Sequence, residues 1–170
     1  MRLNCAVCTV RHWVWSDKDS LVRHANNPKV WRNLLDHFPH PYSDDDALRW
    51  LSHVGALPEP TQWAIDVDGQ AVGGIGVELG QGNYSQTGQF GYWLGEDYWG
   101  RGIMSAAVSA TVEYVFSAVA VGRLEARVFE WNPASMRILE KCGFVREAVL
   151  RKSALKDGHL IDTALYARLK

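Results

Sequence analysis

The chain has little of what marks secreted, membrane-spanning or nucleic-acid-binding proteins. It has three cysteines among 170 residues, and no apolar run is long enough for a transmembrane helix. Its formal net charge of −1 leaves no excess of basic residues with which to bind nucleic acid or anionic lipid non-specifically. Arg2, Asn4, Arg11 and His12 interrupt the apolar residues near the start, so we expect no signal-peptide core there. These absences favour a cytoplasmic protein with neither a nucleic-acid nor a membrane partner.

The three cysteines do not suffice for a metal centre of the usual composition. Cys5 and Cys8 have the C-x-x-C spacing of zinc and redox sites, but no second pair completes a tetrahedral site. Residues 5–15 are predicted to form a strand, on which positions three apart face opposite sides. We therefore expect reduced thiols at Cys5 and Cys8, and no metal.

What the chain does have is the composition of a globular domain. Hydrophobic residues make up 47% of it, which is enough to form a core and too many for a disordered chain. It contains no internal repeat, low-complexity segment or interdomain linker. We therefore expect one domain over residues 1–170.

The most informative stretch is a glycine-flanked turn between a predicted strand and a predicted helix. Residues 89–94 are aromatic and β-prone, and residues 103–116 carry apolar side chains at helical spacing. Gly100 and Gly102 allow backbone conformations that a side chain would forbid, and the first amides of a helix lack internal acceptors. With Arg101 beside them, these amides suit phosphate oxygens, although the turn matches neither a Walker loop nor a dinucleotide fingerprint. A plain tight turn is the alternative interpretation.

Local signals along the rest of the chain predict a mixed α/β sheet. Ser43 and Asp46 form a capping box, and Asp68-Gly69 and Asp157-Gly158 are two-residue hairpin signals. Asn132 and Pro133 suit a helix start, and Gly143 suits a helix end. Strands and helices alternate in a way that is typical of an α/β fold. Besides the elements above, strands are expected near 5–15, 62–67, 70–79, 123–130, 148–155 and 160–169, and helices near 19–26, 28–35, 44–54 and 133–142.

Two segments resemble the motifs of a known family. Residues 92–104 read Tyr-Trp-Leu-Gly-Glu-Asp-Tyr-Trp-Gly-Arg-Gly-Ile-Met and look like the acetyl-CoA motif of the GNAT superfamily. Residues 132–144 read Asn-Pro-Ala-Ser-Met-Arg-Ile-Leu-Glu-Lys-Cys-Gly-Phe and look like its second motif. Together they are similar to the branch of ribosomal-protein N-terminal acetyltransferases. The resemblance spans nearly the whole chain, because residues 11–19 and the closing hairpin also fit.

The resemblance implies an N-acetyltransferase with acetyl-CoA as co-substrate and no metal. The implied fold is a single GNAT-like domain whose mixed, mostly antiparallel, twisted sheet has about six to seven strands, a central splay and about four flanking helices. Amides from Gly100 to Met104 are expected to hold the CoA pyrophosphate, and the strand around Trp93 is expected to bind the pantetheine arm like an added strand. The implied cofactor-binding residues are Trp93, Leu94, Trp99, Gly100, Arg101, Gly102, Ile103, Met104, Asn132 and Ser135.

Three positions depart from the usual pattern of the family. Trp99 stands in place of Arg or Gln at the start of the phosphate turn, and Met104 in place of a small residue; both suit this branch. Leu139 stands where many GNAT enzymes carry the tyrosine that protonates the leaving thiolate, and leucine donates no proton. Ser135 is the expected substitute, unless it only satisfies an amide at the helix start. A non-catalytic acyl-CoA sensor on the same fold is the alternative that Leu139 favours.

The acceptor is expected to be a primary amine, a protein N-terminus or a small molecule, which attacks the thioester directly in a ternary complex. An α-amino group with a pKa of about 7.7–8.0 is partly neutral at pH 7, whereas a lysine-like amine at about 10.4 is almost wholly protonated. An α-amine therefore asks less of a general base, for which Glu78 is the first candidate and Glu96 the second. We expect a monomer or a homodimer. A proline-containing loop is expected to bind the substrate through His37, Phe38, His40 and Tyr42, and its two histidines are further candidate bases.

Overall fold

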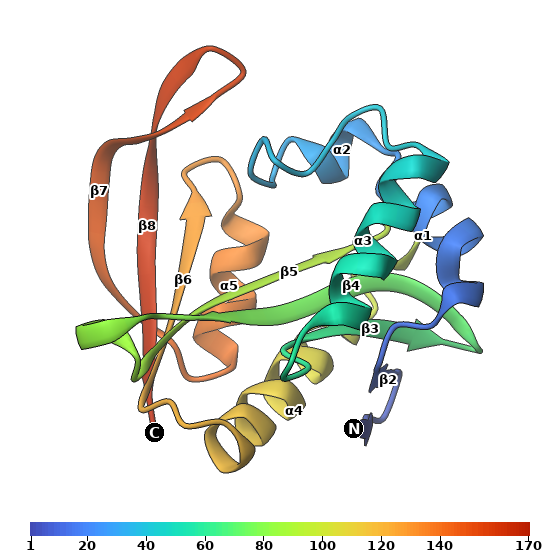
Figure 1. The fold of residues 1–170 in the computed structure, drawn as a ribbon. Helices are drawn as coiled ribbons and strands as arrows, with labels where there is room; N and C mark the ends of the chain where they lie inside the picture. The colour runs from blue at the N-terminus through green and yellow to red at the C-terminus, as the bar shows by residue number, and fades with distance from the viewer. The chain divides into compact units, whose positions relative to one another are not determined.

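The computed structural model describes residues 1–170 and forms an eight-stranded mixed sheet with five α-helices (Figure 1). The strand order is β1-β2-β3-β4-β5-β6-β8-β7. The β5–β6 ladder is parallel, and the β1–β2, β2–β3, β3–β4, β6–β8 and β7–β8 ladders are antiparallel. None of the helices has the length and apolarity needed to span a membrane. The strands are β1 (Arg2–Asn4), β2 (Thr9–Arg11), β3 (Gln62–Val67), β4 (Gln70–Leu79), β5 (Thr87–Leu94), β6 (Arg123–Phe129), β7 (Val145–Lys156) and β8 (His159–Leu169); the α-helices are α1 (Lys18–Ala25), α2 (Pro28–Trp31), α3 (Asp44–Ala56), α4 (Ile103–Ala118) and α5 (Pro133–Lys141); and the 3₁₀ helices are η1 (Trp15–Asp17), η2 (Gly82–Tyr84) and η3 (Glu96–Tyr98).

The chain divides into two compact units. Unit 1 comprises residues 1–76 and 92–111, and unit 2 comprises residues 77–91 and 112–170. Strands β4 and β5 and helix α4 each contribute residues to both units. The expectation of a single domain over residues 1–170 stays a prediction.

The α/β fold class is confirmed, with one or two more strands and one more helix than expected. Part of the difference lies in residues 5–15, which do not form the single strand that was predicted. Cys5 to Cys8 instead form the turn between β1 and β2, closed by a hydrogen bond of 2.9 Å from Cys5 N to Cys8 O. The prediction that these thiols face opposite sides of a strand is therefore wrong, and the Cys8 thiol lies within reach of the Cys5 thiol. Burial raises the pKa of Cys8 to about 12, so this thiol is protonated at neutral pH.

Unit 1 is built on a meander of four strands and two packed helices. The β3–β4 hairpin turns at Asp68-Gly69, as predicted, and both residues have positive φ values, 52° and 82°. Helices α1 and α3 lie side by side (Figure 1) and bury an apolar cluster between them. The predicted capping box starts α3: the Ser43 side chain accepts a bond from Asp46 N, and Asp46 accepts one from Ser43 N. The buried members of the cluster are Leu21, Ala25, Tyr42, Ala47 and Leu51.

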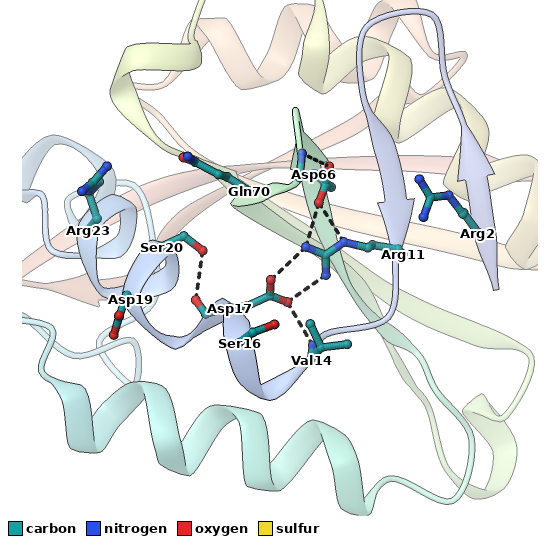
Figure 2. Close-up of a pocket in the computed structure, with 11 residues that line it drawn as sticks. Arg2, Arg11, Val14, Ser16, Asp17, Asp19, Ser20, Arg23, Asp66 and Gln70 are labelled. Carbon is teal, nitrogen blue, oxygen red and sulfur yellow. Dashed lines mark hydrogen bonds and ion pairs between the residues drawn. The ribbon is translucent and has the colours of Figure 1, made fainter.

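A buried ion cluster ties the first strands of unit 1 to the start of α1. Figure 2 shows Arg11 of β2 pointing toward Asp17 of η1 and Asp66 of β3. The Arg11 guanidinium donates two bonds of 2.8 Å to the Asp17 carboxylate and one of 2.8 Å to Asp66. Asp17 is only 4% exposed, and its carboxylate also accepts from Val14 N at 2.9 Å. Asp17 is the N-cap residue of α1 but makes no side-chain cap bond to the helix, because its carboxylate is bound to Arg11.

A cleft of about 620 Å³ lies beside this ion cluster, and the residues in Figure 2 line it. Three of its charged lining residues, Arg11, Asp17 and Asp66, pair with one another. Arg11 binds the two aspartates, and the Ser20 hydroxyl donates to Asp17 O at 3.0 Å. The cleft therefore belongs to the scaffold that holds β2, η1 and β3 together.

Unit 2 is built on β6, β8 and β7 with helix α5. Strand β8 pairs with β6 from Phe129↔Thr163 to Arg123↔Leu169, and on its other side with β7. Figure 1 shows β7 and β8 as a long hairpin. It turns at Asp157-Gly158, as predicted, where the φ values are 50° and 76°. The Tyr166 hydroxyl of β8 donates to Glu140 of α5 at 2.8 Å, which joins the helix to the sheet within this unit.

Candidate active site

The glycine-flanked turn has the backbone conformation that its glycines predict. Gly100 and Gly102 have φ values of 73° and 75°, in the left-handed region that side chains rarely adopt. A Cβ atom at either position would meet nothing within 4 Å, so conformation rather than crowding requires glycine here. Helix α4 begins at Ile103, and its first helical bond runs from Ala106 N to Gly102 O at 3.1 Å. The first backbone N–H groups of α4, just after Gly102, therefore have no carbonyl acceptor within the helix.

Trp99 ties this turn back to the end of β5. Its indole Nε1 donates to Leu94 O at 2.8 Å, and its backbone N donates to Glu96 O at 3.0 Å. The bond from the indole gives a physical role to Trp99, which departs from the usual pattern of the family. The same bond uses the Leu94 carbonyl, and the Leu94 side chain is only 6% exposed. Leu94 thus supports the turn within unit 1 through its carbonyl, and its side chain is buried.

Arg101 lies over the ring of Tyr98, with its guanidinium carbon 5.2 Å from the ring centroid. This contact is a cation–π interaction that restrains an exposed arginine. Tyr98 ends η3, and its backbone N donates to Gly95 O at 3.0 Å. The predicted phosphate ligand Arg101 is therefore held by an aromatic residue within the same motif.

Two glycines of β4 make room for Trp93, and sequence reasoning missed them. A Cβ at Gly73 would lie 2.4 Å from Trp93 O, and a Cβ at Gly74 would lie 2.6 Å from Trp93 Nε1. No side chain fits at these separations, so both positions require glycine for the close approach of β5. The available signal was the pair Gly73-Gly74 inside a predicted strand, which is typical of a close backbone approach.

The second motif has the helix start and helix end that were predicted. The Asn132 side chain accepts a bond of 3.2 Å from Ser135 N, and Pro133 is the first helical residue. Gly143 follows the helix with a φ of 82°. Ser135 is half-buried in the first turn of α5, whereas Leu139 is fully buried. In unit 2 Leu139 is therefore a core residue.

The parallel pairing of β5 and β6 is short. It covers Thr87↔Arg123, Gly88↔Leu124 and Gln89↔Glu125. Strand β5 continues to Leu94 and strand β6 to Phe129. The pairing thus ends well before either strand does, which agrees with the predicted central splay of the sheet.

The predicted substrate loop contains residues with different environments. Phe38 is half-buried, with its ring centroid 5.1 Å from that of Tyr42 and 5.7 Å from that of Trp93. Tyr42 is 5% exposed, and burial raises the pKa of its hydroxyl well above the ordinary value. His40 stacks on Trp31 at 5.3 Å and is joined to Pro41 by a cis peptide bond. His37 is exposed. The structure therefore groups Phe38 and Tyr42 with Trp93 in one aromatic cluster and leaves the two histidines at the surface.

The two candidate bases are placed differently. Glu96 binds Lys29 in an ion pair and accepts a bond of 2.9 Å from Asn27 Nδ2, and these hydrogen bonds, that from Lys29 foremost, lower its pKa. A carboxylate engaged in this way shapes η3 and is a poor proton acceptor. Glu78 is exposed near the end of β4, just before the hairpin bond from Gly80 N to Thr87 O. Within unit 2 it therefore lies at the paired end of the β5–β6 ladder, whereas Ser135 follows the opposite end of β6.

These features are those of an α/β protein whose glycine-flanked turn and helix N-terminus suit a phosphate-bearing ligand. Residues 8–145 match the family described as the acetyltransferase (GNAT) domain. The chain therefore belongs to the GNAT acetyltransferase family and is an N-acetyltransferase with acetyl-CoA as its co-substrate.

Relatives of known and unknown activity cover nearly the whole chain. The L-amino acid N-acetyltransferase AaaT of Escherichia coli K12 is 28% identical over 162 residues, which are 95% of this chain and 97% of that protein. The uncharacterized N-acetyltransferase p20 of Bacillus licheniformis is 26% identical over 95% of this chain and 92% of that protein. Among solved structures, the ribosomal L7/L12 N-terminal acetyltransferase RimL in complex with CoA superimposes with a TM-score of 0.87 at 19% identity, over 99% of this chain and 98% of that one. The ribosomal-protein-S5-alanine acetyltransferase from Vibrio fischeri gives 0.82 at 21% identity, over 99% and 96%. At these identities the two structures support the fold alone.

Proposed function

We propose that this enzyme transfers the acetyl group of acetyl-CoA to the α-amino group of an amino acid or of a peptide N-terminus, by direct attack in a ternary complex. The observation that carries the proposal is the turn before α4, where two left-handed glycines precede helical amides without internal acceptors. A relative named as an L-amino acid N-acetyltransferase supports an α-amine, because the amine common to all primary L-amino acids is the α-amine.

The chain's own residues suit the pyrophosphate of CoA. The amides from Gly100 to Met104 lie at the positive end of the α4 dipole, and Arg101 supplies a full charge next to them. Both glycines are exposed, and nothing lies within 4 Å of where their Cβ atoms would stand. Large phosphate oxygens therefore have room to approach this backbone. By the family resemblance, Trp93 and Asn132 contact the pantetheine arm.

The chemistry favours an acceptor that is partly neutral without help. An α-amino group has a pKa of about 7.7–8.0, so at neutral pH a sizeable fraction is ready to attack. Glu96 is occupied by Lys29 and Asn27, which leaves Glu78 and the exposed loop histidines as the remaining candidate bases. An α-amine needs little from any of them. Ser135 is then the group that donates a proton or hydrogen bond to the departing thiolate, a role that buried Leu139 does not fill.

Acceptor class is tested by the release of free thiol from acetyl-CoA with a matched set of amines. We expect turnover with L-amino acids or with short peptides that begin with alanine or serine. Their N-acetylated forms should give none, since the attacking amine is then blocked. Turnover with spermidine alone would contradict an α-amine acceptor, and a relative from Vibrio cholerae named spermidine N(1)-acetyltransferase makes spermidine the right comparison.

Replacing Gly102 with valine is expected to weaken CoA binding by about tenfold or more, because the left-handed conformation costs an L-residue about 1–2 kcal/mol and most for a β-branched one. The backbone would relax toward negative φ and turn the amides away. Isothermal titration of CoA measures this loss. Gly158→Val is the matched control, since Gly158 has a φ of 76° and open space around it but lies in the β7–β8 turn. Equal affinity in a folded Gly102→Val protein would rule out phosphate binding at this turn.

A further inference from the structure

His24 of α1 is a buried histidine that the family motifs do not include. It is 6% exposed, and its Nε2 atom is buried without a hydrogen-bond partner. A buried imidazole that lacks an anionic partner is stable only in its neutral form, because burial penalises the charged form. Burial therefore favours the neutral form of His24.

The imidazole packs against the segment that leads into the phosphate turn. An ideal Cβ on Gly95 would lie 2.8 Å from His24 Nδ1 and 3.0 Å from its Cβ and Cγ, so the ring rests directly on the Gly95 backbone. Gly95 N in turn donates to Val72 O of β4 at 2.8 Å. The glycine is thus fixed between a strand and the histidine ring.

His24 also contacts the residue that supports Arg101. The rings of His24 and Tyr98 meet edge to face, with centroids 5.4 Å apart and planes at 84°. On the same Tyr98 ring, the Arg101 guanidinium carbon lies 5.2 Å from the centroid. A chain of contacts thus runs from His24 through Tyr98 to the charged residue of the phosphate turn.

The charges around His24 oppose a second positive charge there. Arg23 precedes it on α1 and disfavours the imidazolium, whereas Asp97 of η3 favours it but makes no hydrogen bond to the ring. Glu96 is bound to Lys29 and Asn27 and so provides no free carboxylate. Burial, with a smaller contribution from Arg23, lowers the pKa of His24 below the ordinary value of 6.5.

We propose that His24 is a positioning residue for acetyl-CoA binding, whose neutral imidazole holds Gly95 and Tyr98, and through them Arg101, in the phosphate-binding arrangement. Protonation of the ring displaces this segment and weakens CoA binding in acid. The inference rests on the proposed function of the turn as the pyrophosphate site.

The direction in which pH changes CoA affinity follows from proton uptake by His24. A displaced segment returns His24 to solvent, where its pKa is about 6.5, while the seated ring binds fewer protons. Lowering the pH through this pKa therefore favours the displaced segment. Raising the pH restores the state in which the ring packs against Gly95 and Tyr98. The effect adds to the protonation of the CoA phosphate groups, which have a pKa of about 6 and weaken binding equally in every variant.

The experiment compares CoA affinity by calorimetry at about pH 8 and about pH 5.5 in the wild type, His24→Phe and His53→Phe. Phenylalanine keeps a flat ring against Gly95 and Tyr98 and takes up no proton. We expect wild-type affinity to fall about fivefold more than that of His24→Phe between the two pH values, since the phenylalanine ring takes up no proton that could displace the segment. His53 is exposed on α3, so His53→Phe should follow the wild type.

The CoA affinities of these variants distinguish a failure of the His24 role from a failure of the proposed pyrophosphate site. Equal pH dependence in the wild type and His24→Phe would overturn the role of His24, provided both bind CoA at about pH 8. No binding by the wild type at either pH would overturn the proposed function of the turn instead. Should His24→Phe unfold, His24→Asn serves in its place, because asparagine keeps the first side-chain atoms and does not titrate. A further check is Gly95→Ala, whose methyl group is placed in contact with the His24 ring and should lower CoA affinity at every pH.

Discussion

Alanine in place of Ser135 is expected to lower kcat by about 10²–10⁴ while acetyl-CoA affinity changes little, because a positioned acid acts on the departing thiolate and not on the bound co-substrate. The helix start should survive the change. Its cap is the bond from Ser135 N to the Asn132 side chain, and this bond involves only the backbone of Ser135. Steady-state kinetics with saturating acceptor measures kcat, and calorimetry with CoA measures affinity.

The matched control for this change is Ser117→Ala. Ser117 is an exposed serine of α4 whose hydroxyl donates to Tyr114 O at 2.8 Å, so its loss should leave kcat unchanged. A decrease in kcat of less than about threefold for Ser135→Ala would mean that less than ~1 kcal/mol of the activation barrier depends on this hydroxyl. Ser135 would then be a helix-start residue only, and a water molecule would be the better candidate for the acid.

Methionine in place of Arg11 is expected to lower the free energy of unfolding by about 3–5 kcal/mol, because it leaves buried carboxylates without their cation. Asp17 is 4% exposed, and Asp66 is 9% exposed, so neither recovers full hydration in the folded chain. Methionine keeps most of the apolar stem of arginine. The loss therefore reports the charge and its hydrogen bonds and not a cavity.

Chemical denaturation of Arg11→Met beside Arg49→Met measures the effect. Arg49 also pairs with an aspartate, Asp46, but its side chain is 71% exposed, and an exposed pair of this kind contributes about 0–1 kcal/mol. Both variants remove one arginine, but Arg11 loses two buried ion pairs and Arg49 one exposed pair, so the difference between them reports the stability contributed by the buried cluster. If Arg11→Met were as stable as Arg49→Met, the ion cluster of unit 1 would contribute no more than a surface contact.

The elements that could be predicted are those whose signals lie within a few residues of one another. Ser43 and Asp46 cap α3, Asp68-Gly69 turns the β3–β4 hairpin, and Gly100 and Gly102 take left-handed conformations in the turn before α4. Each depends on a side-chain reach or a backbone angle that three or four adjacent residues settle among themselves. The family motifs are local in the same sense, which is why the class of enzyme followed from two short segments.

The first strand shows where such reasoning ends. Residues 5–15 have β-prone composition throughout, and nothing local distinguishes one long strand from a hairpin. The Cys5–Cys8 turn exists because β1 and β2 pair with each other and β2 pairs with β3. Pairing partners some fifty residues away in the chain, such as Val10 and Ile65, determine this register.

By itself, then, the amino-acid sequence determined the turns, the caps and the family of this protein, because those depend on neighbours along the chain. Only the tertiary structure decided that Asp17 would join Asp66 in binding Arg11 and not cap α1, and that Gly73 and Gly74 would admit Trp93. It also decided that His24 would lie against Gly95 and Tyr98, some seventy residues further along. These contacts join residues whose proximity no periodicity encodes, since burial and close approach arise only when the sheet and helices have packed.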